Sequence, residues 1–306
     1  MISLPTLAAR LGLLCAGALL LTQPVFAATD TWPALDAPLP TISGTEWRWA
    51  VAGEGPISLH GAINRDKAGG ETQAMLYPAF NPLSFVAAVL THAAINSGIR
   101  SAEQEKQLKD ADLVLQPLSS AMENLTVQRI TTGVAQHSEL LAEHQMNPAS
   151  PPEWLVEITP SFVLAQDLRL LTLDAQILVW PAAKGKVPVA MRKIRVLSDP
   201  LNQDGISSYW ADNNGAALQR IGSGLLAEAI ELAVQSWPTA DASLQRTLKF
   251  RDGTVVRAER AQLLGTACGR LHARNLRGWL LSVPASEVIA GEDKTPSCDV
   301  VAARFH

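Results

Sequence analysis

Cysteine and tyrosine are scarce in this chain, and no cysteine motif for a metal is present. The 306 residues include three cysteines and two tyrosines. None of the cysteines forms a C-x-x-C pair, which excludes a zinc ribbon or an iron–sulfur cluster held by cysteines alone. With 47% hydrophobic and 18% charged residues, the chain can bury a large core, which excludes a disordered or coiled-coil protein.

An excess of one charge is also lacking. Lys and Arg total 25 against 29 Asp and Glu, a formal net charge of -4. This balance excludes nucleic-acid binding driven by overall charge, although it permits a local basic surface. No G-x-S-x-G or S-x-x-K motif is present, so the two commonest serine-hydrolase signatures of the periplasm are missing.

Metal and phosphate motifs are equally sparse. None of the six histidines belongs to an H-E-x-x-H motif or a close pair on one helical face. Gly222-Ser223-Gly224, followed by Ala227, matches a phosphate-binding G-x-G-x-x-A turn, but it lies within a helical pattern and no strand is predicted before it. We interpret these small residues as a site of close helix packing. We therefore predict no metal ion and no cofactor.

The first 27 residues have the pattern of a secretory signal peptide. Arg10 precedes an apolar run over Leu11–Leu21, and small residues at Val25 and Ala27 suit signal peptidase. The run is about half the roughly 20 apolar residues that a membrane span needs. We predict cleavage after Ala27, a periplasmic location and no transmembrane span after cleavage.

Cleavage would leave two cysteines, because Cys15 lies in the signal peptide. Cys268 and Cys298 are then an even pair in an exported chain, which favours one disulfide. Closing that loop would stabilise the fold by roughly 3 to 4 kcal/mol in the chain-entropy model. The alternative is two buried free thiols.

An N-terminal α+β unit is expected over residues 41–147, after an extended arm over 28–40. Residues 47–51 and 57–63 alternate apolar and polar side chains across Gly53-Glu54-Gly55-Pro56, which predicts a β-hairpin. The helix predicted from Pro82 to Ser97 is apolar on most sides, so it is either buried in the core or a docking surface. A short strand over 73–77 and helices over 102–117, 118–124 and 126–143 complete this unit.

A second unit is expected over residues 153–238. The side-chain period changes to two over 154–164, 171–179 and 187–197, which predicts a three-stranded antiparallel meander. Asn213 or Asn214 can cap a long helix that ends before Pro238 and covers the sheet. The chain therefore has the pattern of an α+β protein, with antiparallel meander sheets each covered by helices.

Short motifs in this second unit carry a resemblance to known proteins. Thr159-Pro160, Asp167, Arg169, Ser198-Asp199-Pro200 and Trp210-Ala211-Asp212 resemble segments of exported bacterial envelope proteins of no assigned function. The resemblance covers about the middle half of the chain. It implies a bacterial envelope protein and supplies no activity.

The third unit, over 241–306, is a small, basic β unit that the disulfide would close. Asp252-Gly253 predicts a hairpin, and 278–283 a later strand. Residues 241–279 hold eight basic side chains against three acidic ones, a net charge of +5. This charge suggests an anionic partner, while the alternative is a solvated face balanced by acidic neighbours. The predicted binding residues are Arg246, Lys249, Arg251, Arg257, Arg270 and Arg274.

These features predict a soluble periplasmic protein of the bacterial cell envelope that binds without catalysis. Its partner would be an anionic envelope component or an envelope protein. Trp32 and Trp279 are the tryptophans that we expect to be exposed for ligand contacts. The alternative function is a periplasmic hydrolase that acts on cell-wall or lipid substrate, with a site assembled from distant residues.

Overall fold

The computed structural model describes residues 47–63, 106–146, 152–181 and 187–289. These elements belong to one compact unit, Thr31–His306. The predicted signal peptide, the arm, the strand over 73–77, the Pro82–Ser97 helix and Cys298 lie outside the described residues.

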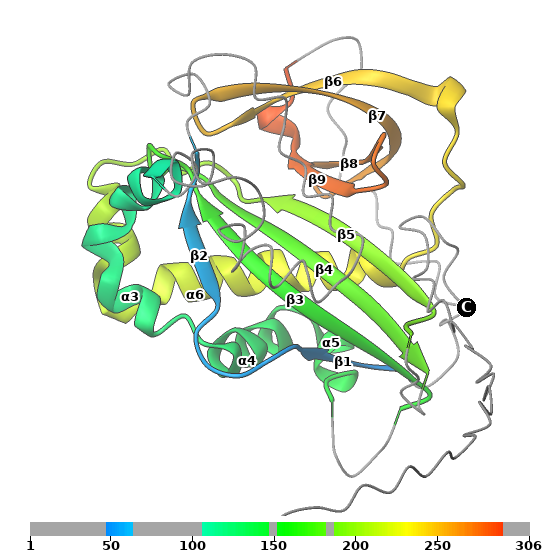
Figure 1. Cartoon of the computed structure of the whole chain (residues 1–306), viewed down its shortest axis with the longest axis horizontal. Coiled ribbons are helices and arrows are strands. Elements are labelled where there is room, and N and C mark those ends of the chain that lie inside the picture. Colours follow the sequence, from blue (N-terminus) through cyan, green and yellow to red (C-terminus); the bar gives the residue numbers. More distant parts are fainter. Residues whose placement is uncertain (1–46, 64–105, 147–151, 182–186, 290–306) are drawn as a thin grey trace, which may run out of the picture. The chain divides into compact units, whose positions relative to one another are not determined.

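The protein has a mixed α+β fold, as predicted, and its described strands form one nine-stranded sheet (Figure 1). The order is β1-β3-β4-β5-β9-β8-β7-β6, and β2 also pairs with β3. Strands from all three predicted units therefore share this sheet. The strands are β1 (Trp47–Val51), β2 (Ser58–Gly61), β3 (Trp154–Leu164), β4 (Leu171–Pro181), β5 (Ala190–Leu197), β6 (Gln245–Asp252), β7 (Val255–Ala267), β8 (Arg270–Asn275) and β9 (Leu280–Pro284).

The predicted meander is confirmed. β3 pairs antiparallel with β4, and β4 pairs antiparallel with β5. One face of each strand carries fully buried apolar residues, such as Ile158, Ile177 and Ile194, which pack in the main core. The period of two in the sequence therefore reports which side chains face the helices.

The N-terminal hairpin prediction is wrong. β1 and β2 both run parallel to β3, on successive halves of its edge, and do not pair with each other. The residues between them bulge out instead of reversing the chain. Gly53 and Gly55 adopt positive φ values of 82° and 87°, and this bulge exchanges backbone hydrogen bonds with residues 125–127. The turn residues between the two strands predicted a reversal of the chain. Because β3 is long, β1 and β2 can instead pair with it one after the other, both in the parallel direction.

Helices cover the face of β3, β4 and β5 that carries the main core. They are η1 (Leu113–Leu118), α3 (Ser119–Glu123), α4 (Val127–His137), α5 (Glu139–Glu143) and α6 (Ile206–Val234), with short 3-10 turns η2 (Ala242–Leu244) and η3 (Ala285–Glu287). Helical residues 106–112 lead into η1, so the helices predicted between 102 and 143 are confirmed where described. None of the described helices has the length and apolar character that a membrane span requires.

Small residues let α4 and α6 approach closely, as predicted for the Gly222-Ser223-Gly224 segment. A Cβ atom on Gly133 of α4 would lie 2.1 Å from Ser223 Oγ. Ser223 Oγ donates a hydrogen bond to the Ile130 carbonyl at 3.2 Å. The segment is therefore a helix contact, with no phosphate-binding turn.

α6 begins earlier than predicted and is kinked where its cap was expected. Residues 206–211 already form a helical segment, and Asn213, Asn214 and Gly215 then take positive φ values. Gly215 is required there for a second reason, because a Cβ atom on it would lie 2.7 Å from Ala121 Cβ. The predicted start at Asn213 or Asn214 corresponds to the second part of the helix.

The C-terminal strands form the other end of the sheet and enclose a second, smaller core that includes Leu248, Phe250 and Val283. The hairpin at Asp252-Gly253 and the strand near 280 are confirmed. β8 was not predicted from the sequence, although Leu271-His272-Ala273-Arg274 alternates.

The predicted disulfide gains no support from the described residues. Cys268 is exposed in the β7–β8 turn and forms no disulfide with any of them. The disulfide-closed unit is thus unsupported, and the Cys268–Cys298 bridge stays a prediction because Cys298 is not described.

Arg169, Ser198 and Trp210, from the motifs that carried the resemblance, lie at one corner of the fold. Arg169 donates to the Leu201 carbonyl at 2.9 Å, and Trp210 Nε1 donates to the Leu168 carbonyl at 2.7 Å. Ser198 Oγ accepts from the Leu171 N–H at 3.0 Å. These bonds fix the β3–β4 turn, against which the tip of the β6–β7 hairpin packs.

Candidate functional site

The outer face of the β6–β7 hairpin is the candidate site. Along β6, Leu248 and Phe250 are buried while the intervening residues are exposed. The register pairs Thr247 with Arg260, Lys249 with Ala258, and Arg251 with Val256. Because side chains alternate across a strand, these six residues share the face away from the second core. The hairpin outer face is therefore Thr247, Lys249, Arg251, Val256, Ala258 and Arg260.

The carboxylates of this hairpin lie on its opposite face. Asp252 forms an ion pair with Arg257, and their side chains are only 11% and 26% exposed. Glu259 accepts a hydrogen bond from Asn275 Nδ2 at 2.9 Å. The strand alternation thus places both acids on the inward face, with Arg257, and leaves Lys249, Arg251 and Arg260 on the outer face.

The six predicted binding residues divide into two groups. Arg246, Lys249 and Arg251 are exposed on β6, but Arg246 pairs with the buried Ala261 and so does not share the hairpin outer face with the other two. Arg257 is drawn inward by Asp252. Arg270 and Arg274 lie on β8 and are largely buried, with 15% of the Arg270 side chain exposed.

Arg270, Arg274 and Arg257 are therefore corrections to the predicted surface. Arg274 is 6% exposed and donates to the Pro238 carbonyl at 2.7 Å. The prediction selected cations by their position in the chain, without the strand parity. Parity within the Asp252-Gly253 hairpin would have selected Lys249, Arg251 and Arg260, of which Arg260 was missed.

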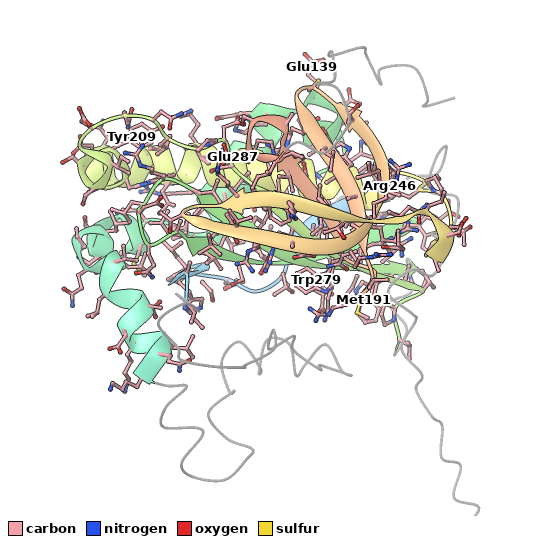
Figure 2. The ribbon with its side chains drawn as sticks, turned by 90° about the horizontal axis from the view of Figure 1, so that it is seen from above. Glu139, Met191, Tyr209, Arg246, Trp279 and Glu287 are labelled. Carbon is pink, nitrogen blue, oxygen red and sulfur yellow. The ribbon has the colours of Figure 1, made fainter. Side chains whose placement is uncertain are left out.

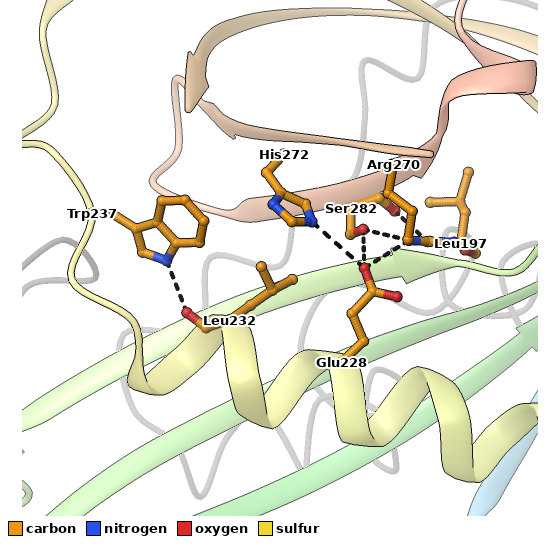
Figure 3. A network of polar contacts seen from close by, with 7 residues as sticks. All are labelled: Leu197, Glu228, Leu232, Trp237, Arg270, His272 and Ser282. Atoms are coloured by element: carbon orange, nitrogen blue, oxygen red, sulfur yellow. Dashed lines mark hydrogen bonds and ion pairs between the residues drawn. The ribbon is translucent and has the colours of Figure 1, made fainter. Parts of the chain in front are cut away.

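A polar network joins α6 to β8 and β9 (Figure 3). Arg270 Nε donates to Glu228 Oε1 at 2.7 Å and to Ser282 Oγ at 2.8 Å. Ser282 Oγ donates to the same Glu228 oxygen. His272 Nε2 lies 3.8 Å from that oxygen, and its ring meets Trp237 edge-on. Glu228 is thus the acceptor at which the other three polar side chains converge.

The electrostatics of this network favour the ionised carboxylate. Burial alone would raise the pKa of Glu228, but the interactions with His272, Arg270 and Ser282 outweigh it and lower the pKa below its ordinary 4.5. A serine, a histidine and a carboxylate are also the components of a hydrolase triad. Here the carboxylate lies between the other two, whereas a triad places the histidine there. Ser282 is also fully buried, so its hydroxyl is not exposed to a substrate.

A second cluster lies on the face of β5 opposite the main core. Arg195 donates two hydrogen bonds of 2.6 Å to Asp174. Burial would lower the pKa of Arg195, but Asp174 raises it, so the guanidinium stays charged. Trp279 packs against it, with the Arg195 and Lys193 charged groups 5.5 and 5.7 Å from the ring centroid. Figure 2 shows Trp279 on the same side of the sheet as Met191, which precedes Lys193 on β5.

Trp279 is therefore half-buried against cations, and the prediction that it is exposed is wrong. Trp32 lies outside the described residues. Within the described part of the chain, no three His, Cys, Asp or Glu side chains come together in a way that could hold a metal ion. No family model, no curated protein and no solved structure matches this chain.

Proposed function

We propose that this chain is a periplasmic binding protein of the bacterial cell envelope that acts without catalysis. Its ligand is an anionic envelope component, held on the hairpin outer face. The observation that carries the proposal is the charge sorting of the hairpin. Asp252 and Glu259 face inward, where Arg257 and Asn275 engage them. The cations of the outer face therefore have no carboxylate of the hairpin beside them on that face.

The charge of the remaining chain strengthens the contrast. The chain as a whole has a formal net charge of -4, while residues 241–279 have a net charge of +5. A cationic face on an otherwise acidic protein orients the molecule toward an anionic surface and speeds encounter. The periplasmic location in this proposal rests on the signal-peptide pattern of residues 1–27.

The proposal includes a disulfide between Cys268 and Cys298. Cys268 lies exposed in the turn between β7 and β8. An oxidising compartment favours the bridge. It would tie the C-terminal residues to the end of the sheet that carries the hairpin.

A hydrolytic function gains less support from the described residues. It needs a nucleophile that a substrate can reach, and Ser282 of the Glu228 network has no exposed surface. We therefore retain binding as the proposed function.

The test is salt-dependent binding of the purified chain to two anionic probes. These are polyphosphate and vesicles of phosphatidylglycerol mixed with phosphatidylethanolamine. Binding should weaken steeply as salt rises, because ions at about 0.15 M limit attraction to about 8 Å. The double variant Lys249→Glu/Arg251→Glu should bind at least about 30-fold more weakly, given about 1 kcal/mol for each cation near an anionic surface.

The matched control is Lys106→Glu/Arg129→Glu, which changes the net charge equally at two exposed cations on other elements. It should retain most of the binding. Both double variants should melt near the temperature of the parent chain. If the chain binds neither probe at low salt, or if the hairpin variant binds as tightly as the parent chain, the proposed function is refuted.

A further inference from the structure

Three of the four most exposed large apolar side chains among the described residues lie around the hairpin outer face. Among the described residues, four such side chains are more than half exposed: Leu113 at 55%, Leu244 at 52%, Val256 at 56% and Leu276 at 66%. The last three belong to the end of the sheet that carries the exposed cations. Single exposed apolar residues need no explanation, but three beside one charged face do.

The strand register and two hydrogen bonds place these apolar residues at both ends of the row of cations. Val256 pairs with Arg251 near the hairpin tip. At the other end, the Leu276 N–H donates to the Arg260 carbonyl at 3.1 Å. Arg260 Nη2 in turn donates to the Gln245 carbonyl at 3.1 Å, next to Leu244. The apolar residues therefore bracket the cations of the hairpin outer face.

Leu276 is held outward by an ordered turn. The side-chain oxygen of Asn275 accepts hydrogen bonds from the N–H groups of Arg277 and Trp279, both at 3.0 Å. Asn275 also donates to Glu259 on β7. Because these bonds fix the turn, little further backbone ordering is needed when a partner covers Leu276.

We infer that the hairpin outer face docks on an anionic lipid surface. This inference rests on the proposed function and names its ligand. The cations would lie at the level of the lipid phosphates, while Leu244, Val256 and Leu276 enter the boundary between headgroups and acyl chains. A soluble anionic polymer would engage the cations and leave these three side chains in water. A lipid surface therefore fits the exposed aliphatic residues beside the cations better than a soluble anionic polymer does.

The experiment compares the same two probes, vesicles of phosphatidylglycerol with phosphatidylethanolamine and soluble polyphosphate. The variant Leu244→Ser/Leu276→Ser should bind the vesicles about tenfold more weakly, because two apolar side chains no longer leave water. Its binding to polyphosphate should be unchanged. The control Leu113→Ser alters an equally exposed leucine on η1 and should leave both affinities unchanged.

Two outcomes distinguish a failure of lipid docking from a failure of anion binding. If the leucine variant binds vesicles as tightly as the parent chain while Lys249→Glu/Arg251→Glu loses binding, the face recognises anions without lipid insertion. The further inference is then wrong and the proposed function stands. If the charge-reversed variant also binds both probes normally, the proposed function itself is wrong.

Discussion

Glu228 on α6 and Arg270 on β8 form a hydrogen-bonded ion pair with an Nε–Oε1 distance of 2.7 Å. The two residues are 42 positions apart in sequence, and their side chains are 22% and 15% exposed. The pair joins the helix that covers the main core to a strand of the second core. It therefore couples the end of the sheet that carries the hairpin to the rest of the fold.

Glu228→Gln should destabilise the protein by about 2 kcal/mol, because a partly buried Arg270 loses its carboxylate. The dependence on pH has a definite sign. The pKa of Glu228 is lower in the folded chain than its ordinary 4.5, so its contribution is present above that value and lost as pH falls through the folded pKa. Urea unfolding at neutral pH and below about pH 4 measures the free energy of unfolding at each pH. The variant should lose less of it on acidification than the parent chain does.

Glu231, one turn further along α6, provides the control with the opposite sign. Burial raises the pKa of Glu231, and the charge of the nearby Glu228 raises it further. A hydrogen bond from Ser138 lowers it, but by less. Glu231→Gln should therefore leave stability at neutral pH unchanged or increase it. Equal destabilisation by both variants would show that the loss arises from altered packing instead of the Glu228–Arg270 pair.

The thiols of the exported protein test the proposed bridge. Neither Cys268 nor Cys298 should react with a thiol-labelling reagent until reductant is added, and mass spectrometry should find one linked peptide pair. Replacing Cys268 with Ser should lower stability by roughly 3 kcal/mol in the chain-entropy model. Prompt labelling of Cys268 without reductant, as its exposure allows, would rule out the bridge.

Much of the fold could be predicted where one local pattern decides it. The meander over β3, β4 and β5 follows from strict alternation, and Asp252-Gly253 specifies a tight hairpin. β1 and β2 could not be placed in this way, because the available edge of β3 is a long-range property. Gly53 and Gly55 serve a bulge as readily as a reversal.

The candidate site was predictable only in part for a similar reason. Charge counting located the basic segment but could not separate exposed cations from paired ones. Arg270 became a buried partner because α6 brings Glu228 to it, and no local pattern contains that contact. Strand parity alone would have separated Lys249 and Arg251 from Arg257.

The tip of the β6–β7 hairpin is seated on the β3–β4 turn through Gly253. This residue adopts a φ of +64°, and a Cβ atom there would lie 2.8 Å from Ala165 Cβ. Gly253→Ala should cost about 1 kcal/mol for the left-handed backbone and about 2 kcal/mol more for the clash. Gly205→Ala is the matched control, because Gly205 has a φ of +67° with nothing within 4 Å of its Cβ position.

Chemical unfolding of the two variants isolates the contact between the hairpin and the turn. Both carry the same backbone strain, so the difference between their free energies of unfolding reports the clash with Ala165. The Gly253→Ala variant should also bind anionic vesicles more weakly, since its hairpin tip carries Arg251 beside Val256. Equal losses of stability in the two variants would mean that the hairpin tip shifts away from Ala165 without cost. This contact would then not position the hairpin outer face.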